Sequence, residues 1–225
     1  MQDKLSAAVE SGNSDEVQRL LAGGASINAK GSDGLTALMR ACLKGHAAVA
    51  RVLLDKGADV DVQDNYGWSA LLWASSLGQV EIAKMCISKG ANLGVKDQYG
   101  ATSLMKAARR NFPDVVKLLI GSGADVNAKD GMGRTALMRA ARRGYSEVAR
   151  LLLDAGADTE ESDERGATAL IIGASEGQVE TVKVLLEFGA AIHARDKNGW
   201  TPWLWAFSAG HAEVVKLLKT YGAEY

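Results

Sequence analysis

Residues 133–158 read GRTALMRAARRGYSEVARLLLDAGAD and contain two helix signals that are separated by a glycine. The first signal, TALMRAARR, ends at Gly144, and the second, SEVARLLLDA, ends at Gly156. An extended acidic segment follows the second glycine. Two short helices of this kind form one helix pair, which cannot bury its apolar face alone and needs neighbours stacked against it.

The same helix pair recurs along the chain with a period of 33 residues. One series of glycines precedes the first helix of each pair, and another follows the second helix. The two series are Gly34, Gly67, Gly100, Gly133, Gly166 and Gly199, and Gly24, Gly57, Gly90, Gly123, Gly156, Gly189 and Gly222. Glycines that keep one spacing from end to end indicate a tandem repeat array.

The period and two local motifs resemble the ankyrin repeat family. The segments TALM and TPWL stand where that family has T-P-L-H, and GADVNA at 123–128 resembles the tail of its repeat. Only Thr201-Pro202 keeps the Thr-Pro dipeptide of the family, because the other repeats have Ala or Ser after the hydroxyl residue. The resemblance spans essentially all 225 residues. It implies an all-α solenoid of helix-turn-helix repeats with short β-hairpin finger loops between them.

We expect about seven repeats that form a single domain over residues 1–225. Residues 1–30 lack a TALM segment and carry polar residues at outward positions, which is typical of an N-terminal capping repeat. The predicted full repeats span 31–63, 64–96, 97–129, 130–162 and 163–195, and 196–225 is the predicted C-terminal cap. In that cap Phe207 occupies a position where the other repeats have Cys, Ser or Ala. An alternative for these end aromatics is an apolar face that pairs with another molecule.

Helix boundaries follow from the chemistry of the capping residues. A hydroxyl residue stands at the expected N-cap of each first helix, as Thr135 does, and its oxygen can accept from the free N–H groups of the first turn. Glycine ends most first helices, since a left-handed residue there disfavours a Cβ atom. The fourth repeat has Asn111-Phe112-Pro113 instead. Asparagine tolerates the left-handed conformation and proline suits the first turn of the next helix, so we expect the same helix ending there.

Composition excludes several classes of partner. The net charge is −1 and the pI is about 6.3, so no overall charge attracts nucleic acid or an acidic membrane. No window approaches a membrane span, and the first residues do not read as a signal peptide. Cys42 and Cys86 occupy apolar repeat positions, so we expect buried thiols, no disulfide and a reducing, cytoplasmic compartment. We also expect a monomer.

The sequence carries no pattern of a catalytic or cofactor site. His46 and His211 follow the glycine before a second helix, where the family commonly has Gly-His for structural reasons, and the remaining histidine is His193. Two lone cysteines give no metal-ligand spacing. The glycines match neither phosphate-binding loop motif. We therefore expect no enzyme activity, no metal and no cofactor.

One group of cationic and aromatic residues on the first helices and fingers indicates a partner-binding surface. Residues at i, i+3 and i+4 share a helix face, and in the fourth and fifth repeats these positions hold six cations. Aromatic residues precede them in the third and fourth repeats. The resemblance implies that first helices and fingers line a concave groove used for partner binding. The predicted contact residues are Tyr66, Trp68, Trp73, Tyr99, Lys106, Arg109, Arg110, Arg139, Arg142 and Arg143.

These residues predict a protein or peptide partner, with arginines for an acidic segment or terminal carboxylate and aromatic residues as apolar anchors. One alternative is a solvated face that is partly neutralised by the acidic segment from Asp158 to Glu164. Nucleic acid is the least favoured occupant, because the rest of the surface is not basic. Two other functions stay open, a structural or engineered scaffold without a partner and an array that regulated an attached catalytic domain.

Overall fold

The computed structural model describes residues 2–223, and these residues form fourteen α-helices in seven pairs. Each predicted repeat range contains one pair. The chain divides into two compact units. The N-terminal unit comprises residues up to 103 together with 121–123, and the C-terminal unit comprises 104–120 and the residues from 124 onward. The all-α fold implied by the resemblance to the ankyrin repeat is confirmed.

The N-terminal unit contains three helix pairs. They are α1 (Gln2–Glu10) with α2 (Ser14–Ala22), α3 (Ala37–Lys44) with α4 (Ala47–Asp55), and α5 (Ala70–Ser76) with α6 (Val80–Ser88). The first helices α1, α3 and α5 contact one another in order, and so do the second helices α2, α4 and α6. Leu38, Leu53 and Leu71 are fully buried between the two layers. Stacking therefore buries the apolar faces that a single pair would expose.

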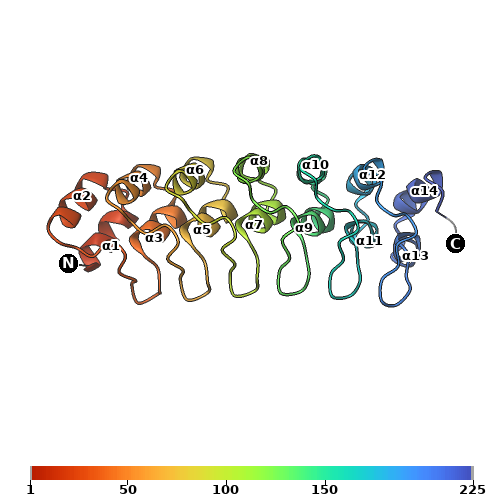
Figure 1. Ribbon diagram of the computed structural model, residues 1–225, viewed down its shortest axis with the longest axis horizontal. Coiled ribbons are helices and arrows are strands. Elements are labelled where there is room, and N and C mark those ends of the chain that lie inside the picture. The colour runs from red at the N-terminus through yellow and green to blue at the C-terminus, as the bar shows by residue number, and fades with distance from the viewer. Residues whose placement is uncertain (1, 224–225) are drawn as a thin grey trace. The chain divides into compact units, whose positions relative to one another are not determined.

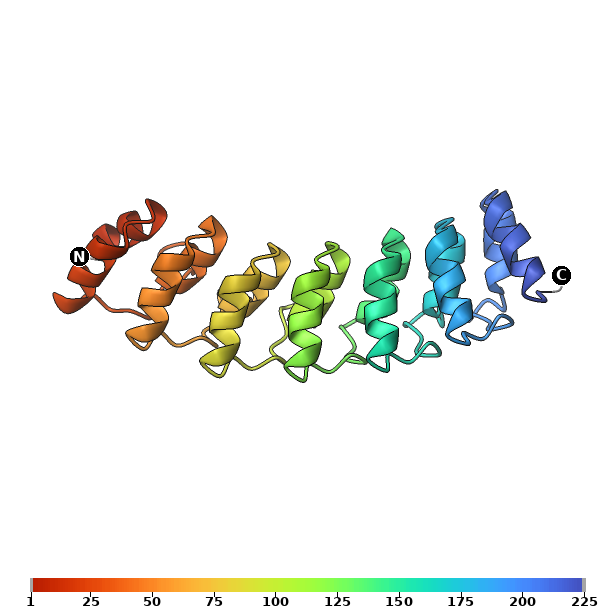
Figure 2. The same cartoon turned by 90° about the horizontal axis from the view of Figure 1, so that it is seen from above.

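The C-terminal unit has the same two layers. Its helices are α7 (Ser103–Arg109), α8 (Pro113–Gly121), α9 (Ala136–Arg143), α10 (Ser146–Asp154), α11 (Ala169–Ser175), α12 (Val179–Glu187), α13 (Pro202–Ser208) and α14 (Ala212–Thr220). Helices α9, α11 and α13 contact one another in order, as do α10, α12 and α14 (Figure 1). The second helices lie side by side when they are viewed from above (Figure 2). The loops before α9, α11 and α13 extend away from the layer of second helices (Figure 1).

The predicted caps are formed. The side chain of Thr135 accepts a hydrogen bond from the Met138 amide, and Thr36, Ser69, Thr168 and Thr201 cap their helices in the same way. Gly144 ends α9 in the left-handed region with φ of 74°. Asn111 has φ of 59° and is the one residue other than glycine with positive φ in residues 2–223. The interpretation of Asn111 as a substitute for glycine is confirmed.

In several repeats a polar side chain after the first helix bonds to the backbone of the preceding repeat. His46 Nε2 donates to the Glu10 carbonyl at 3.0 Å, and His211 Nε2 donates to the Ser175 carbonyl at 3.1 Å. Gln79 Nε2 donates to the Cys42 carbonyl at 2.6 Å from the equivalent position. These carbonyls lie at or near the ends of first helices, where backbone acceptors lack helical partners. The structural interpretation of His46 and His211 is therefore confirmed.

The fingers are tight turns and not strands. In the finger before α9, the Asp130 amide donates to the Arg134 carbonyl at 3.0 Å and closes the turn. Within residues 2–223 the β-pairing is limited to one isolated antiparallel bridge between Ser162 and Thr168. The expected β-hairpins are thus present only as turns. The physical reason is that in five fingers an aspartate side chain accepts two backbone donors that a cross-strand ladder would otherwise pair.

Candidate functional site

Five aspartates, which we call the finger aspartates, organise the loops that precede the first helices. They are Asp64, Asp97, Asp130, Asp163 and Asp196. The Oδ1 atom of Asp130 accepts from the amides of Met132 and Arg134 at 2.8 and 2.9 Å. The other four make the same pair of bonds to amides two and four residues later. Each of these five fingers is therefore held by a carboxylate that accepts backbone donors.

In three fingers the residue nine positions after the finger aspartate engages the second oxygen of that aspartate. Trp73 Nε1 donates to Asp64 Oδ2 at 3.1 Å, and Trp205 Nε1 donates to Asp196 Oδ2 at 3.0 Å. In the C-terminal unit Arg139 Nη2 donates to Asp130 Oδ2. Trp73 and Arg139 were both predicted as partner contacts, and the structure uses them to fix the finger to its helix.

The electrostatics of Asp130 follow from this arrangement. Burial raises the pKa of Asp130, but the amides of Arg134 and Met132 and the charge of Arg139 outweigh it, so the pKa lies below its usual range. Burial lowers the pKa of Arg139, Asp130 raises it, and the nearby charges of Arg134 and Arg109 lower it further. Asp130 is therefore ionised at neutral pH, and Arg139 is crowded by other cations.

The sixth repeat breaks the pattern. Nine residues after Asp163 stands Ile172, which has no donor. The Oδ1 atom of Asp163 still accepts the amides of Arg165 and Ala167. A hollow of about 420 Å³ opens here, and its lining includes Asp163, Ile172 and Trp205. We call it the amphipathic hollow. It was not predicted from the sequence.

The predicted aromatic contacts lie in the N-terminal unit. Tyr66 and Tyr99 stand at finger tips with 60% and 66% of their surface exposed. Trp68 and Trp73 are half-buried, and their ring centroids are 4.6 Å apart. The two tyrosines are thus open to a partner, while the two tryptophans brace each other and the finger.

The predicted cations lie in the C-terminal unit, and four of them form an exposed group. Arg109 and Arg110 lie at and just beyond the end of α7, and Arg142 and Arg143 lie at the end of α9. We call these four residues the basic face. Lys106, on the same helix as Arg109, is half-buried.

Part of the basic face surrounds a small hollow. Arg109, Arg134, Arg139, Arg142 and Arg143 line about 140 Å³ together with Met138 and Ile172. We call this the arginine hollow. Arg134 was absent from the predicted site, although its position directly before the N-cap of α9 could have indicated it. The arginine and amphipathic hollows share Arg142 and Ile172, so they adjoin.

The acidic segment from Asp158 to Glu164 contacts other groups than the basic face. Glu161 pairs with Lys129, and Glu160 accepts the Ala191 amide at 2.9 Å. Within the described residues, the ion-pair contact of the basic face is Arg142 Nε with Glu176 Oε1 on α11, at 3.9 Å. One alternative was that this segment partly neutralises the arginines, but within residues 2–223 it forms no ion pair with the basic face. The charge of the basic face is therefore largely uncompensated.

The two cysteine thiols are buried. Cys42 and Cys86, 44 residues apart in sequence, are both free and fully buried. A hydrogen bond with Cys86, together with burial, raises the pKa of the Cys42 thiol well above its usual value, so the Cys42 thiol is protonated. In residues 2–223 no group of three or more His, Cys, Asp and Glu residues is placed to hold a metal ion.

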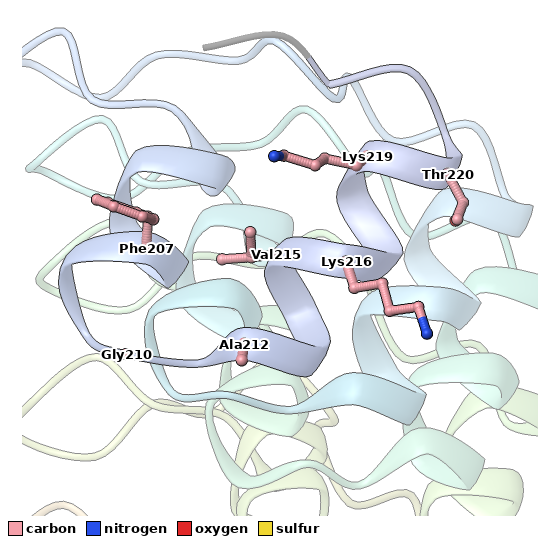
Figure 3. A pocket seen from close by; sticks show the side chains of 7 residues that line it. All are labelled: Phe207, Gly210, Ala212, Val215, Lys216, Lys219 and Thr220. Atoms are coloured by element: carbon pink, nitrogen blue, oxygen red, sulfur yellow. The ribbon is translucent and has the colours of Figure 1, made fainter.

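A third surface lies at the last described helix pair. Phe207 is 63% exposed and stacks on the buried Trp203 with ring centroids 5.0 Å apart. Between α13 and α14 is a hollow of about 570 Å³ lined by Phe207, Val215 and Lys219 among others (Figure 3). The equivalent Ala174 is fully buried under the next repeat's helices. The position of Phe207 thus has room for a large ring.

Comparison with known proteins agrees with the helix pairing. A family model described as "Ankyrin repeats (3 copies)" matches residues 5–97, 85–163 and 155–225. No curated protein gives a significant match. In the part of the chain that the structure describes, no helix combines the length and apolarity needed to cross a bilayer.

Proposed function

Because the chain belongs to the ankyrin repeat family, we propose that it binds a protein partner and that the basic face contacts an acidic segment of that partner. Ankyrin repeat domains generally serve as protein-interaction modules and are typically non-catalytic. The proposed role is therefore recognition by a preformed surface.

The observation that carries the proposal is the uncompensated charge of the basic face. Arg109, Arg110 and Arg143 have no ion-pair partner within residues 2–223, and the Glu176 contact of Arg142 is long. A guanidinium group presents donors in a planar fork that matches a carboxylate. An acidic partner would supply the acceptors that these arginines lack.

Two features favour a partner over a merely solvated face. Arg109 at the end of α7 and Arg142 and Arg143 at the end of α9 line one hollow. The chain as a whole carries a net charge of −1, so this surplus is local. A local basic patch on a weakly acidic protein favours an acidic protein segment over nucleic acid, which needs a broader basic surface.

The exposed tyrosines of the N-terminal unit are a second proposed contact surface. Tyr66 and Tyr99 present large rings at finger tips, and tyrosine is enriched among residues that dominate binding energy. We expect Tyr99→Ala to weaken partner binding by about 1–2 kcal/mol or more, through faster dissociation. Trp68→Ala would also loosen the finger, so it is a less specific probe.

The test compares two double variants with equal change of charge. In one, Arg109 and Arg142 become Glu, and in the other the exposed Lys84 and Lys183 on second helices become Glu. Partners captured by the wild-type chain are measured with both variants by surface-immobilised kinetics. We expect the arginine variant to associate more slowly and with a flatter dependence on ionic strength, because the steering field is gone. The lysine variant should behave like wild type.

Equal kinetics for the two variants would refute the proposal. Circular dichroism and thermal unfolding of both variants establish that each is folded. Loss of binding in both variants alike would indicate a general charge effect and would also contradict a specific basic face.

A further inference from the structure

The arginine hollow contains more positive charge than its own residues neutralise. Five guanidinium groups line it. Asp130 Oδ2 accepts from Arg134 and Arg139, and Glu176 lies 3.9 Å from Arg142. Two carboxylates thus face five guanidinium groups. The surplus is concentrated on Arg109, Arg142 and Arg143.

These groups surround a hollow instead of forming a flat patch. Arg109 enters from the end of α7, Arg134 from the finger, and Arg139, Arg142 and Arg143 from α9. The charges of Arg134 and Arg109 act on Arg139 strongly enough to lower its pKa, after the larger effects of burial and Asp130. An anion among them would relieve this repulsion. The hollow of about 140 Å³ holds more than a single water, whose share of liquid volume is about 30 Å³.

We propose that the arginine hollow binds a phosphate monoester dianion carried by a serine or threonine side chain of the protein partner. A phosphate dianion has about twice the charge of a carboxylate and three terminal acceptor oxygens. Its tetrahedral oxygens can be shared by guanidinium groups that approach from different sides. A planar carboxylate fits the fork of one arginine, so it would leave the others unsatisfied.

The adjoining amphipathic hollow favours a peptide as the carrier of the phosphate. It is about three times larger, shares Arg142 and Ile172 with the arginine hollow, and is lined by apolar Ile171 and Trp205 as well as by charged residues. A residue next to the phosphorylated side chain could pack there. A free phosphate ion would leave this hollow unused. The proposal rests on the proposed function, because it specifies the chemistry that the basic face recognises.

The experiment uses the full chain and three peptide libraries with randomised flanking residues. The fixed central residue is phosphothreonine, glutamate or threonine, and binding is measured by fluorescence anisotropy. We expect the phosphothreonine library to bind at least about tenfold more tightly than the glutamate library. Arg143→Gln and Arg109→Gln should abolish this difference. Lys183→Gln is the matched control, since Lys183 is an exposed cation of α12 outside the basic face and outside the lining of the hollow, and it should retain the preference.

A pH series gives an independent readout. The second pKa of a phosphate monoester is about 6, so the phosphopeptide should lose affinity as the pH falls from roughly 7.5 to roughly 5.5. The charged groups that face the hollow are the five arginines, Asp130 and Glu176, and none of these residue types ordinarily titrates in that range. The glutamate library should bind with little change over the same interval.

The outcomes separate this inference from the proposed function. Equal affinity for phosphothreonine and glutamate libraries, with both weakened by Arg143→Gln, would overturn the phosphate proposal and leave acidic-segment binding intact. Binding that no basic-face variant changes would overturn both. Inorganic phosphate could shift the arginine side-chain NMR signals of the hollow while phosphothreonine peptides do not bind. That result would overturn the peptide proposal in favour of a small phosphate ligand. Preferential binding to phosphoinositide vesicles would overturn it in favour of a membrane surface.

Discussion

Arg139 lies nine residues after Asp130, and its Nη2 donates a hydrogen bond to the buried Oδ2 of that aspartate. Only 10% of the Arg139 side chain is exposed, and the Asp130 side chain is fully buried. Trp73 and Trp205 stand in the same relation to Asp64 and Asp196. One repeat position therefore fixes the finger to the first helix, with a donor whose identity changes from repeat to repeat.

Removing the donor at this position should cost stability. We expect Arg139→Ala to lower the free energy of unfolding by about 2 kcal/mol, because it leaves a buried carboxylate short of one charged partner while Arg134 and two amides remain. Arg143→Ala, at an exposed residue of the same helix, should change it by about 0.5 kcal/mol or less. Urea unfolding measures both, and equal midpoints would contradict a structural role for Arg139.

The ionised Asp130 predicts a pH dependence. Its folded-state pKa is lowered, so its contribution to stability is present above the unfolded pKa of about 3.9 and is lost as the pH falls through the folded value. Asp130→Asn removes this titration. The variant should be less stable than wild type at neutral pH, and the gap should narrow as the pH falls below about 4. Thermal midpoints over this range test the sign, and a gap that widens on acidification would refute it.

A donor can also be added at this repeat position, because Ile172 has none. Tryptophan at this position would present an indole N–H to Asp163, as Trp73 and Trp205 do to their aspartates. The amphipathic hollow beside Ile172 provides room for the larger ring. We expect Ile172→Trp to be more stable than Ile172→Phe by about 1 kcal/mol, since phenylalanine supplies similar bulk without the donor. Chemical unfolding of the two variants decides this, and equal stability would show that the second oxygen of Asp163 needs no partner.

Two glycines with similar backbone conformation should differ in tolerance. Gly156 has φ of 86° and no atom within 4 Å of an added Cβ, whereas a Cβ on Gly166 would lie 2.9 Å from the Lys197 amide nitrogen. Gly156→Ala should therefore cost only the left-handed strain of about 1–2 kcal/mol. Gly166→Ala adds a collision with the backbone of the next finger, and we expect a larger loss. Comparable unfolding midpoints for the two variants would rule out this close approach of neighbouring fingers.

The sequence by itself determined the repeat, the helix pairs and their caps. N-caps such as Thr135 and the glycines that end helices act within one helix or one turn, so they can be identified without tertiary information. Their repetition every 33 residues indicates the array. Asn111 could be interpreted for the same reason. The capping chemistry is local and depends little on what the neighbouring repeat contains.

Only the tertiary structure decided which arginines are available. The i, i+3 and i+4 rule placed Arg139 with Arg142 and Arg143 on one helix face, but a buried aspartate across the finger turn binds Arg139 and leaves the other two exposed. The arginine hollow also needs Arg109 from the preceding repeat and Arg134 from the finger. Such an arrangement depends on how side chains from different repeats meet in space, and the helical periodicity of a single repeat contains no information about those distances.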